Sequence, residues 1–278
     1  MLFKKSLLIL CCVFSSAAFA ERWFEVEVLI FKQRPAPYLQ EDFILKKEPI
    51  KASNKIDLLT PLYTQQAKQD CIAGDSRFNS NSLTDSVIGA SRSNLCDDSI
   101  DYIASFDSLP LSPEAETRDD MISTYLLNPE QLQFKSQQRE LVRKGLKPLL
   151  HTGWRFEGAS KSRSQSIKLF GGQHLTTPPI TNTSLANNAN FISLVNPSQS
   201  FEPAMQQASD KWELDGFFNI YLRHYLYINA NIDISEKLDN GEIQSARFSQ
   251  FKRVISGEVH YFDHPKMGMI VQIRKFKH

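Results

Sequence analysis

The sequence predicts an α+β fold that is rich in β-structure and ends in an antiparallel meander. Apolar and polar residues alternate almost without interruption over 214–234, which is the pattern of a half-buried antiparallel strand. Strand and helix patterns do not alternate regularly along the chain, so a doubly wound parallel sheet is not expected. Between 38 and 127 the pattern fades, and we expect a long irregular insertion there that bears a disulfide.

The first twenty residues have the features of a secretory signal peptide. Lys4 and Lys5 precede a short apolar run at 6–14, and Ala18-Phe19-Ala20 fits the small-x-small cleavage pattern. The run is shorter than the roughly 20 apolar residues that cross a bilayer. We therefore expect 1–20 to be removed after Ala20, leaving a single mature domain, 21–278, in the periplasm with no membrane span. An uncleaved N-terminal anchor is the alternative.

Charge and cysteine content narrow the possible partners. The 278 residues include 32 Lys and Arg against 31 Asp and Glu, a net charge of +1, which is not the basic excess of a dedicated nucleic-acid binder. Two of the four cysteines lie in the expected signal peptide. The other two, Cys71 and Cys96, are expected to form a disulfide in an oxidising compartment, with two free thiols as the alternative.

The first half of the mature chain contains one well-patterned strand and one helix. The strand is 23–31, in which four apolar residues share one face and two glutamates share the other: Phe24, Val26, Val28 and Ile30; Glu25 and Glu27. A helix is expected from the N-cap Asn128 to Gly145. Its apolar stripe consists of Phe134, Leu141 and Val142.

Five further strands are expected after this helix. The first two strands are 147–156 and 166–170, and the second of them is expected to end at the pair Gly171-Gly172. The segment 176–210 is rich in Asn, Ser, Thr and Pro and is expected to be a loop. The alternating segment 214–234 predicts one long strand, bent near Gly216. The return strand is 248–262, and a tight turn leads to the last strand at 269–276.

One polar cluster has the composition of a metal or acid–base site. Glu258, His260, Asp263 and His264 lie close together in the sequence, and alternate positions on a strand can direct two imidazoles and a carboxylate to one metal ion. Two alternatives stay open: a structural role, because Asp-His-Pro is typical of a turn, and the binding of a ligand by these four residues. The sequence has neither a Gly-x-Ser-x-Gly elbow nor a His-Glu-x-x-His zinc motif. We therefore expect no catalytic residue, no resident metal and no cofactor.

An aromatic and polar surface is the second candidate site. Tyr221, Arg223, Tyr225 and Tyr227 occupy alternate positions of the expected long strand, and planar rings of this kind stack on sugars. The pair Trp154 and Arg155 would extend the surface. The alternative is an ordinary solvated sheet face, which aromatic residues occupy through their β-propensity. Too few basic residues accompany the tyrosines for a nucleic-acid site.

Several segments occur in an order that resembles a known family. They are 23–31 at the mature start, Leu149-Leu150-His151-Thr152-Gly153-Trp154, then 214–216 with Leu222-Arg223-His224-Tyr225-Leu226, and 253–265, which contains Glu258-Val259-His260-Tyr261-Phe262-Asp263-His264-Pro265. Together with the expected export signal, they resemble the CsiV family of periplasmic peptidoglycan-binding proteins of Gram-negative bacteria. The resemblance omits the two weakly patterned stretches.

The resemblance implies a non-enzymatic role in cell-wall synthesis. Members of the family are thought to bind peptidoglycan and to assist a class A penicillin-binding protein through its outer-membrane lipoprotein activator, LpoA. No binding residues are carried over from the family. Two other functions stay open: a periplasmic wall hydrolase or metalloenzyme that uses the Glu258/His260/Asp263/His264 cluster, and an envelope assembly factor that uses exposed sheet edges.

Overall fold

The computed structural model describes residues 22–34, 48–75, 96, 100–175 and 211–277. The expected signal peptide, the loop at 176–210 and parts of the 38–127 insertion lie outside the described residues. Of the elements described, ten are strands and three are helices. The fold is thus the β-rich, antiparallel arrangement that the sequence predicts.

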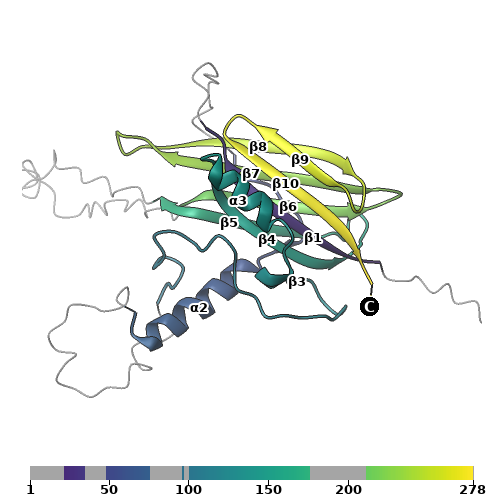
Figure 1. Ribbon diagram of the computed structural model, residues 1–278, viewed down its shortest axis with the longest axis horizontal. Helices are drawn as coiled ribbons and strands as arrows, with labels where there is room; N and C mark the ends of the chain where they lie inside the picture. The colour runs from purple at the N-terminus through teal and green to yellow at the C-terminus, as the bar shows by residue number, and fades with distance from the viewer. Residues whose placement is uncertain (1–21, 35–47, 76–95, 97–99, 176–210, 278) are drawn as a thin grey trace, which may run out of the picture.

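The strands form two five-stranded sheets that face each other (Figure 1). The first sheet has the order β3-β4-β1-β10-β9, and the second has the order β2-β5-β6-β7-β8. Their bounds are β1 Trp23–Lys32, β2 Lys55–Ile56, β3 Tyr125–Leu126, β4 Lys147–Glu157, β5 Ser166–Leu175, β6 Lys211–Leu222, β7 Leu226–Lys237, β8 Ile243–Val254, β9 Val259–His264 and β10 Met267–Phe276. All pairings are antiparallel except the short one between β2 and β5.

One hydrophobic core fills the space between the two sheets. The ring of Trp154 in β4 meets Phe218 in β6 edge-on, with centroids 5.5 Å apart. At the other side of the sandwich, Phe248 in β8 and Phe262 in β9 meet in the same way at 6.4 Å. These contacts hold the inner faces of the sheets together, as alternating apolar residues on each strand require.

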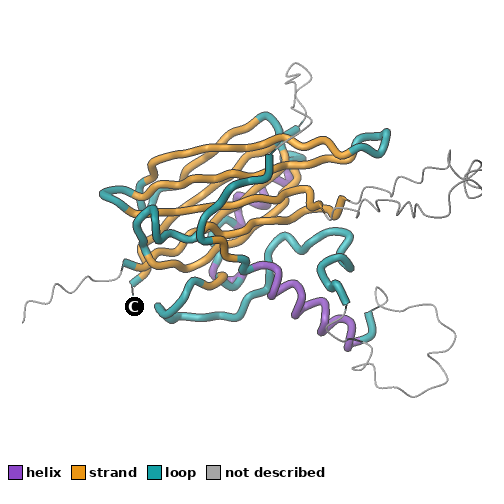
Figure 2. The backbone as a smooth tube through the Cα atoms, turned by 180° about the vertical axis from the view of Figure 1, so that it is seen from behind, coloured by secondary structure: helices purple, strands orange, loops and turns teal. Residues whose placement is uncertain are grey.

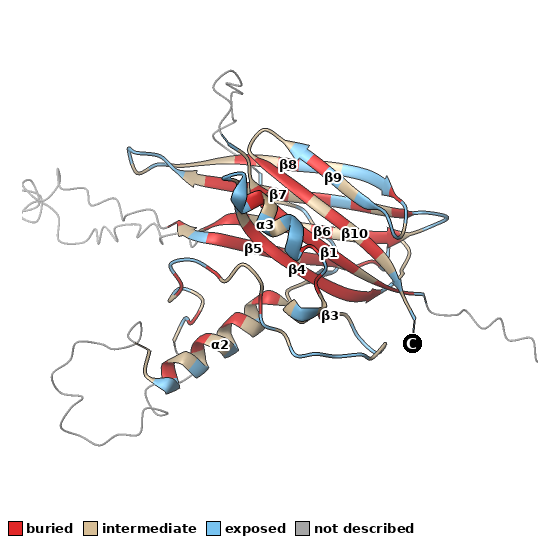
Figure 3. Cartoon of the chain, in the orientation of Figure 1, coloured by how far each residue is buried: buried red, intermediate tan, exposed pale blue. Residues whose placement is uncertain are grey.

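Strand β1 is buried on both faces, as Figure 3 shows for β1 and β4. Its even-numbered apolar residues face the core between the sheets. On the outer face, Leu29 and Phe31 pack under the helix α3 (Lys135–Arg143), against Phe134 and Leu141. The predicted division of this strand into two faces is confirmed, and the helix that covers its second face comes from more than a hundred residues away.

A buried carboxylate joins this outer face to its helix. The side chain of Glu27 is fully buried and accepts hydrogen bonds from the backbone N–H groups of Gln133, at 2.8 Å, and Phe134, at 2.6 Å. It also binds His151 of β4 at 2.9 Å and Arg274 of β10 at 3.0 Å. The carboxylate therefore caps the start of α3 and links three strands at one point.

The expected helix from Asn128 to Gly145 is two helices. Asn128 caps a short 3-10 helix, Pro129–Gln131, through a capping box with Gln131. The chain then extends and re-enters α3, which ends before Gly145 at a positive φ of 72°. Leu141 is buried as predicted, whereas Val142 is 57% exposed. The interruption places the N–H groups of 133 and 134 against Glu27, which a continuous helix would not do.

The insertion contains a longer helix than the sequence predicts. Helix α2, Leu59–Ala73, packs beside β5 at the edge of the sandwich (Figure 1). Its buried Tyr63 meets Phe106 and Phe170 edge-on. The predicted disulfide between Cys71, near the end of this helix, and Cys96 is confirmed. Only brief apolar runs mark this segment in the sequence, because the helix buries a narrow stripe against a core formed by other strands.

The single long strand expected at 214–234 is wrong. It is a hairpin of β6 and β7, closed at the pair Leu222 and Leu226 by a turn of three residues. A turn with an odd number of residues returns the chain with the same parity, so the alternation continues through it. The turn Arg223-His224-Tyr225 also lacks Gly, Pro, Asn and Asp, the residues that usually mark a turn.

The strand expected at 248–262 is also two strands, which lie in different sheets. β8 ends at Val254 in the second sheet, and after a short turn β9 begins at Val259 in the first. Between the two edges, Gln250 donates to the carbonyl of Asp263 at 2.8 Å and Lys252 to the carbonyl of Tyr261 at 3.3 Å. Side chains thus close this edge of the sandwich where backbone pairing stops.

Strand β5 runs beyond the glycine pair that was expected to end it. It continues to Leu175, and its pairing with β6 shifts register between Gly171 and His174. Gly172 has a φ of 79°, a left-handed conformation that glycine adopts without strain. The glycine pair therefore makes a bulge inside the strand rather than its end.

Replacing Glu27 by Gln should destabilise the protein in a pH-dependent way. Burial raises the pKa of Glu27, but hydrogen bonds from His151, Phe134, Gln133 and Arg274 outweigh it and hold the pKa below its ordinary value of 4.5. The charged form therefore stabilises the fold fully above about pH 4.5, and this contribution is lost as the pH falls through the lower pKa of the folded state. We expect Glu27→Gln to lower the free energy of unfolding at pH 7 by roughly 3 kcal/mol.

Urea denaturation at pH 7 and at pH 3 measures this effect, with Glu116→Gln, at an exposed position, as the control. The difference between Glu27→Gln and the parent should shrink at the lower pH. Equal stability of the two proteins at pH 7 would show that the charge of Glu27 does not hold α3 and the three strands together.

Candidate functional site

Three aromatic rings are stacked across the outer face of the second sheet, the face toward the viewer in Figure 2. Tyr221 in β6 stacks on Tyr227 in β7 at 5.1 Å, and Tyr227 stacks on Phe251 in β8 at 5.7 Å with the ring planes 2° apart. Tyr221 and Tyr227 are direct cross-strand partners in the hairpin. The three rings therefore run across the strands, and the expected row of tyrosines along one strand is wrong.

Exposure within this group rises toward its outer strand. Tyr221 is 5% exposed, whereas Phe251 is 61% exposed and Tyr225, in the hairpin turn, is 49% exposed. Two arginines lie over the rings: Arg223 over Tyr221, and Arg253 over Tyr225 at 4.5 Å from the centroid. We call Tyr221, Tyr225, Tyr227 and Phe251, with Arg223 and Arg253, the aromatic surface. Its ring faces and guanidinium groups can stack on sugars and bind their hydroxyl or carboxylate groups.

A groove adjoins the aromatic surface at one end of the sandwich. There β1 begins, β10 ends, and the β6–β7 and β8–β9 turns lie close to both. The groove has a volume of about 590 Å³, and Tyr225 lines it as well as belonging to the aromatic surface. We call it the end groove. Its lining includes aromatic and basic side chains from three segments: Arg22, Trp23, His224, Tyr225, Lys275 and Lys277.

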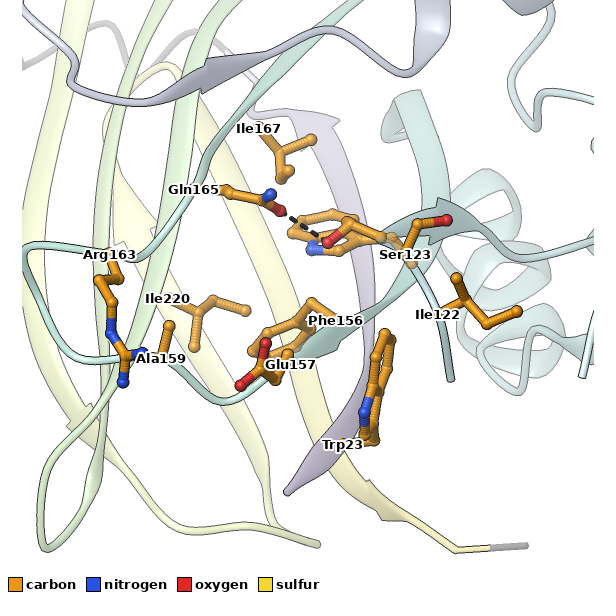
Figure 4. A pocket seen from close by; sticks show the side chains of 12 residues that line it. Trp23, Ile122, Ser123, Phe156, Glu157, Ala159, Arg163, Gln165, Ile167 and Ile220 are labelled. Atoms are coloured by element: carbon orange, nitrogen blue, oxygen red, sulfur yellow. Dashed lines mark hydrogen bonds between the residues drawn. The ribbon is translucent and has the colours of Figure 1, made fainter. Parts of the chain in front are cut away.

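A smaller crevice lies on the other side of Trp23 (Figure 4). It has a volume of about 140 Å³, and Trp154 and Phe156 line it together with Arg163 and Gln165. Thr124 donates a hydrogen bond to Gln165 at 2.6 Å across it. Trp23 is 5% exposed and its indole nitrogen has no hydrogen-bond partner within the described residues.

Trp154 and Arg155 do not extend the aromatic surface. Trp154 is 1% exposed in the core between the sheets. Arg155 is 5% exposed on the opposite outer face, where it binds Glu25 at 3.1 Å and Asp119 at 2.8 Å. The two residues are on adjacent positions of β4, so their side chains point to opposite faces and neither reaches the second sheet's outer face.

The polar cluster near the C-terminus is held by the turns around it. Asp263 accepts hydrogen bonds from Tyr261 and Gln33, both at 2.9 Å. His264 accepts from the backbone N–H of Lys266 at 3.2 Å, and His260 lies 3.2 Å from the backbone nitrogen of Ile255. In the part of the chain that the structure describes, no three His, Cys, Asp or Glu side chains come together as metal ligands. Glu258, His260, Asp263 and His264, all described, are therefore not brought together as ligands of one metal ion.

Comparison with known proteins adds to this geometry. The chain matches the family model described as "Peptidoglycan-binding protein, CsiV" over residues 2–276. The chain belongs to the CsiV family. No curated protein and no solved structure gives a significant match.

A binding role agrees with this CsiV family description and with the aromatic surface. Neither α-helix within the described residues is long and apolar enough to span a bilayer. The chain contains the sequence Ser249-x-x-Lys252, a spacing that penicillin-binding enzymes use for acylation. On β8, however, these two residues point to opposite faces, since Ser249 donates to Asn231 on the outer face and Lys252 reaches across to β9.

Several residues of the aromatic surface and the end groove were not predicted from the sequence. Phe251 and Arg253 belong to the aromatic surface because β8 pairs with β7, at Asn229 and Tyr227 respectively. Arg22 and Lys275 line one groove because β1 pairs with β10. The alternation of β8 was a usable signal, since it placed Phe251 and Arg253 on one face. The register that pairs β8 with β7 and brings both residues to Tyr227 cannot be inferred from this alternation.

Removal of divalent metal should leave the stability of this protein unchanged, and loss of the Asp263 carboxylate should not. Burial and the hydrogen bond to Asp263 raise the pKa of Tyr261 to about 12, so its hydroxyl remains a donor at neutral pH. Asp263→Ala removes the acceptor of two side chains and should lower the free energy of unfolding by about 1 kcal/mol. Thermal melting with and without EDTA tests both expectations. An EDTA-induced drop of several degrees, with stoichiometric metal by elemental analysis, would restore the metal-site alternative.

Proposed function

We propose that this protein, as a single mature domain of residues 21–278 in the periplasm, binds peptidoglycan without enzymatic activity through its aromatic surface. The observation that carries the proposal is the stacked group of Tyr221, Tyr227 and Phe251, whose exposure rises to 61% at Phe251. Membership of a peptidoglycan-binding family supplies the ligand class.

The chemistry of the surface suits a glycan strand. Sugar rings present C–H groups on their faces, and these pack on aromatic rings, while hydroxyl groups at their edges need polar partners. Around the rings, Asn229 and Ser249 are exposed on the same outer face, and Arg223 and Arg253 lie over Tyr221 and Tyr225. Apolar ring faces with a polar and cationic border therefore match both parts of the ligand.

Substituting the exposed rings should weaken wall binding and leave the fold intact. Phe251→Ala and Tyr225→Ala each remove a ring that is about half exposed or more. We expect each to weaken co-sedimentation with purified sacculi roughly five- to tenfold, or about 1–1.4 kcal/mol, with a melting temperature within a few degrees of the parent. Val142→Ala, which removes an exposed apolar side chain from α3, is the control.

Muropeptide analysis of the same pellets separates binding from hydrolysis. Intact sacculi after incubation are expected, and released fragments would favour the wall hydrolase that the sequence left open. If Phe251→Ala and Tyr225→Ala sediment as the parent does, the aromatic surface is not the wall-binding site.

We further propose that the protein supports a class A penicillin-binding protein through its LpoA-type activator, as the family resemblance implies. Because the aromatic surface is assigned to the wall, the partner should bind elsewhere on the molecule. The immobilised LpoA-type lipoprotein should therefore retain the parent and the Tyr225→Ala/Phe251→Ala double variant equally in the absence of sacculi. Retention of neither protein would refute the partner and leave wall binding standing.

A further inference from the structure

The end groove collects basic side chains that have no acidic partner among the described residues. Arg22, His224, Lys275 and Lys277 line it, and none of the described residues lining it is Asp or Glu. No carboxylate within the described ranges forms an ion pair with any of the four. The whole chain is almost neutral, with 32 Lys and Arg against 31 Asp and Glu. The excess of positive charge in the end groove therefore arises from where the fold places its basic residues and not from the composition of the chain.

Three arginines on the outer faces of the sheets, in contrast, form ion pairs with carboxylates. Arg274 binds Glu25 and Glu27, and Arg247 binds Asp233 through two nitrogens at 2.8 and 2.9 Å. Arg155 also binds two carboxylates. The carboxylates neutralise these three arginines, which therefore contribute to the fold. Arg22, Lys275 and Lys277 of the end groove form no such ion pair with the described residues and can meet an anionic ligand.

Strand pairing explains why the basic residues of the end groove lie close together. β1 and β10 are antiparallel, with Trp23 opposite Phe276 and Phe24 opposite Lys275. The start of the described chain at Arg22 and its end at Lys277 are therefore neighbours. The β6–β7 turn supplies His224 from the other sheet.

The floor of the groove is apolar. Phe24, Leu226 and Val254 are buried residues of the core that also line it. With a volume of about 590 Å³, the groove is large enough for several residues of an extended peptide. An apolar floor under a cationic rim fits a ligand that carries small aliphatic groups and carboxylates together.

From this geometry we propose that the end groove binds the carboxylates of the stem peptides of peptidoglycan. The inference rests on the proposed function, and it deepens it by naming the part of the polymer that the groove recognises. Tyr225 lines the groove and also belongs to the aromatic surface. A glycan strand on the aromatic surface would thus direct its peptide branch into the groove, and one molecule of ligand would fill both.

The test measures binding of soluble wall fragments to the full mature chain by calorimetry. The probes are a disaccharide tetrapeptide with free carboxylates, the same compound with its carboxylates amidated, and an uncharged chitooligosaccharide. The variant is Lys275→Gln with Lys277→Gln; both residues are exposed. Arg22→Gln is a second variant on the neighbouring strand, and Lys237→Gln, at the opposite end of the hairpin, is the control.

The parent should bind the acidic probe about tenfold more tightly than the amidated one. The Lys275/Lys277 variant and Arg22→Gln should lose this preference and keep the parent's affinity for the chitooligosaccharide, with unchanged melting temperatures. Added salt should weaken the parent's binding of the acidic probe more than that of the amidated probe. Equal binding of the two peptide probes by the parent, or an undiminished preference in both variants, would overturn the inference.

Co-sedimentation with sacculi separates the two failures. If the parent does not sediment with sacculi, the proposed function fails. If the parent sediments and shows no preference for the acidic probe, wall binding stands and only the role of the end groove is refuted.

Discussion

The carboxylate of Glu27 is the constraint on which the first sheet depends. It is fully buried, and its partners come from three places in the chain: the start of α3, His151 of β4 and Arg274 of β10. A buried charge without partners would cost several kcal/mol. Any arrangement that misplaces one of these elements leaves the charge partly unsatisfied. The interaction therefore favours one register of the strands and one position of the helix.

This constraint also decides which surface is available to a ligand. The outer face of the first sheet is occupied by α3 and by the ion pairs of Glu25, Arg155 and Arg274. Arg155 and Arg274 are neutralised there, and Leu29 and Phe31 are covered, whereas Val259 and Tyr261 of β9 are exposed. No helix in the part of the chain that the structure describes covers the aromatic rings of the second sheet, and Phe251 and Tyr225 are exposed. The proposed binding surface therefore lies on the second sheet, whereas the outer face of the first sheet stabilises the fold.

Basic residues also differ between the sheet faces and the end of the sandwich. On the sheet faces, Arg247 and Arg274 are held by carboxylates and contribute to the fold. At the end of the sandwich, Arg22, Lys275 and Lys277 surround a groove with an apolar floor. The aromatic surface, bordered by Arg223 and Arg253, meets the end groove at Tyr225, and the described residues offer the cations of that groove no carboxylate partner. Two adjoining surfaces of different chemistry suit a polymer that combines a glycan strand with an acidic peptide.

The sequence by itself determined the β-rich class, the division of β1 into two faces, the parity of 214–234 and the disulfide, because each depends on local periodicity or on a simple pairing. It did not reveal the hairpin, since an odd turn at 223–225 preserves parity and contains no turn-forming residue. Tertiary structure alone decided that Tyr221 and Tyr227 stack, that Phe251 joins them, and that Trp154 and Arg155 are both buried. These facts depend on which strands are neighbours and in what register, and alternation within one strand carries no information about its neighbour.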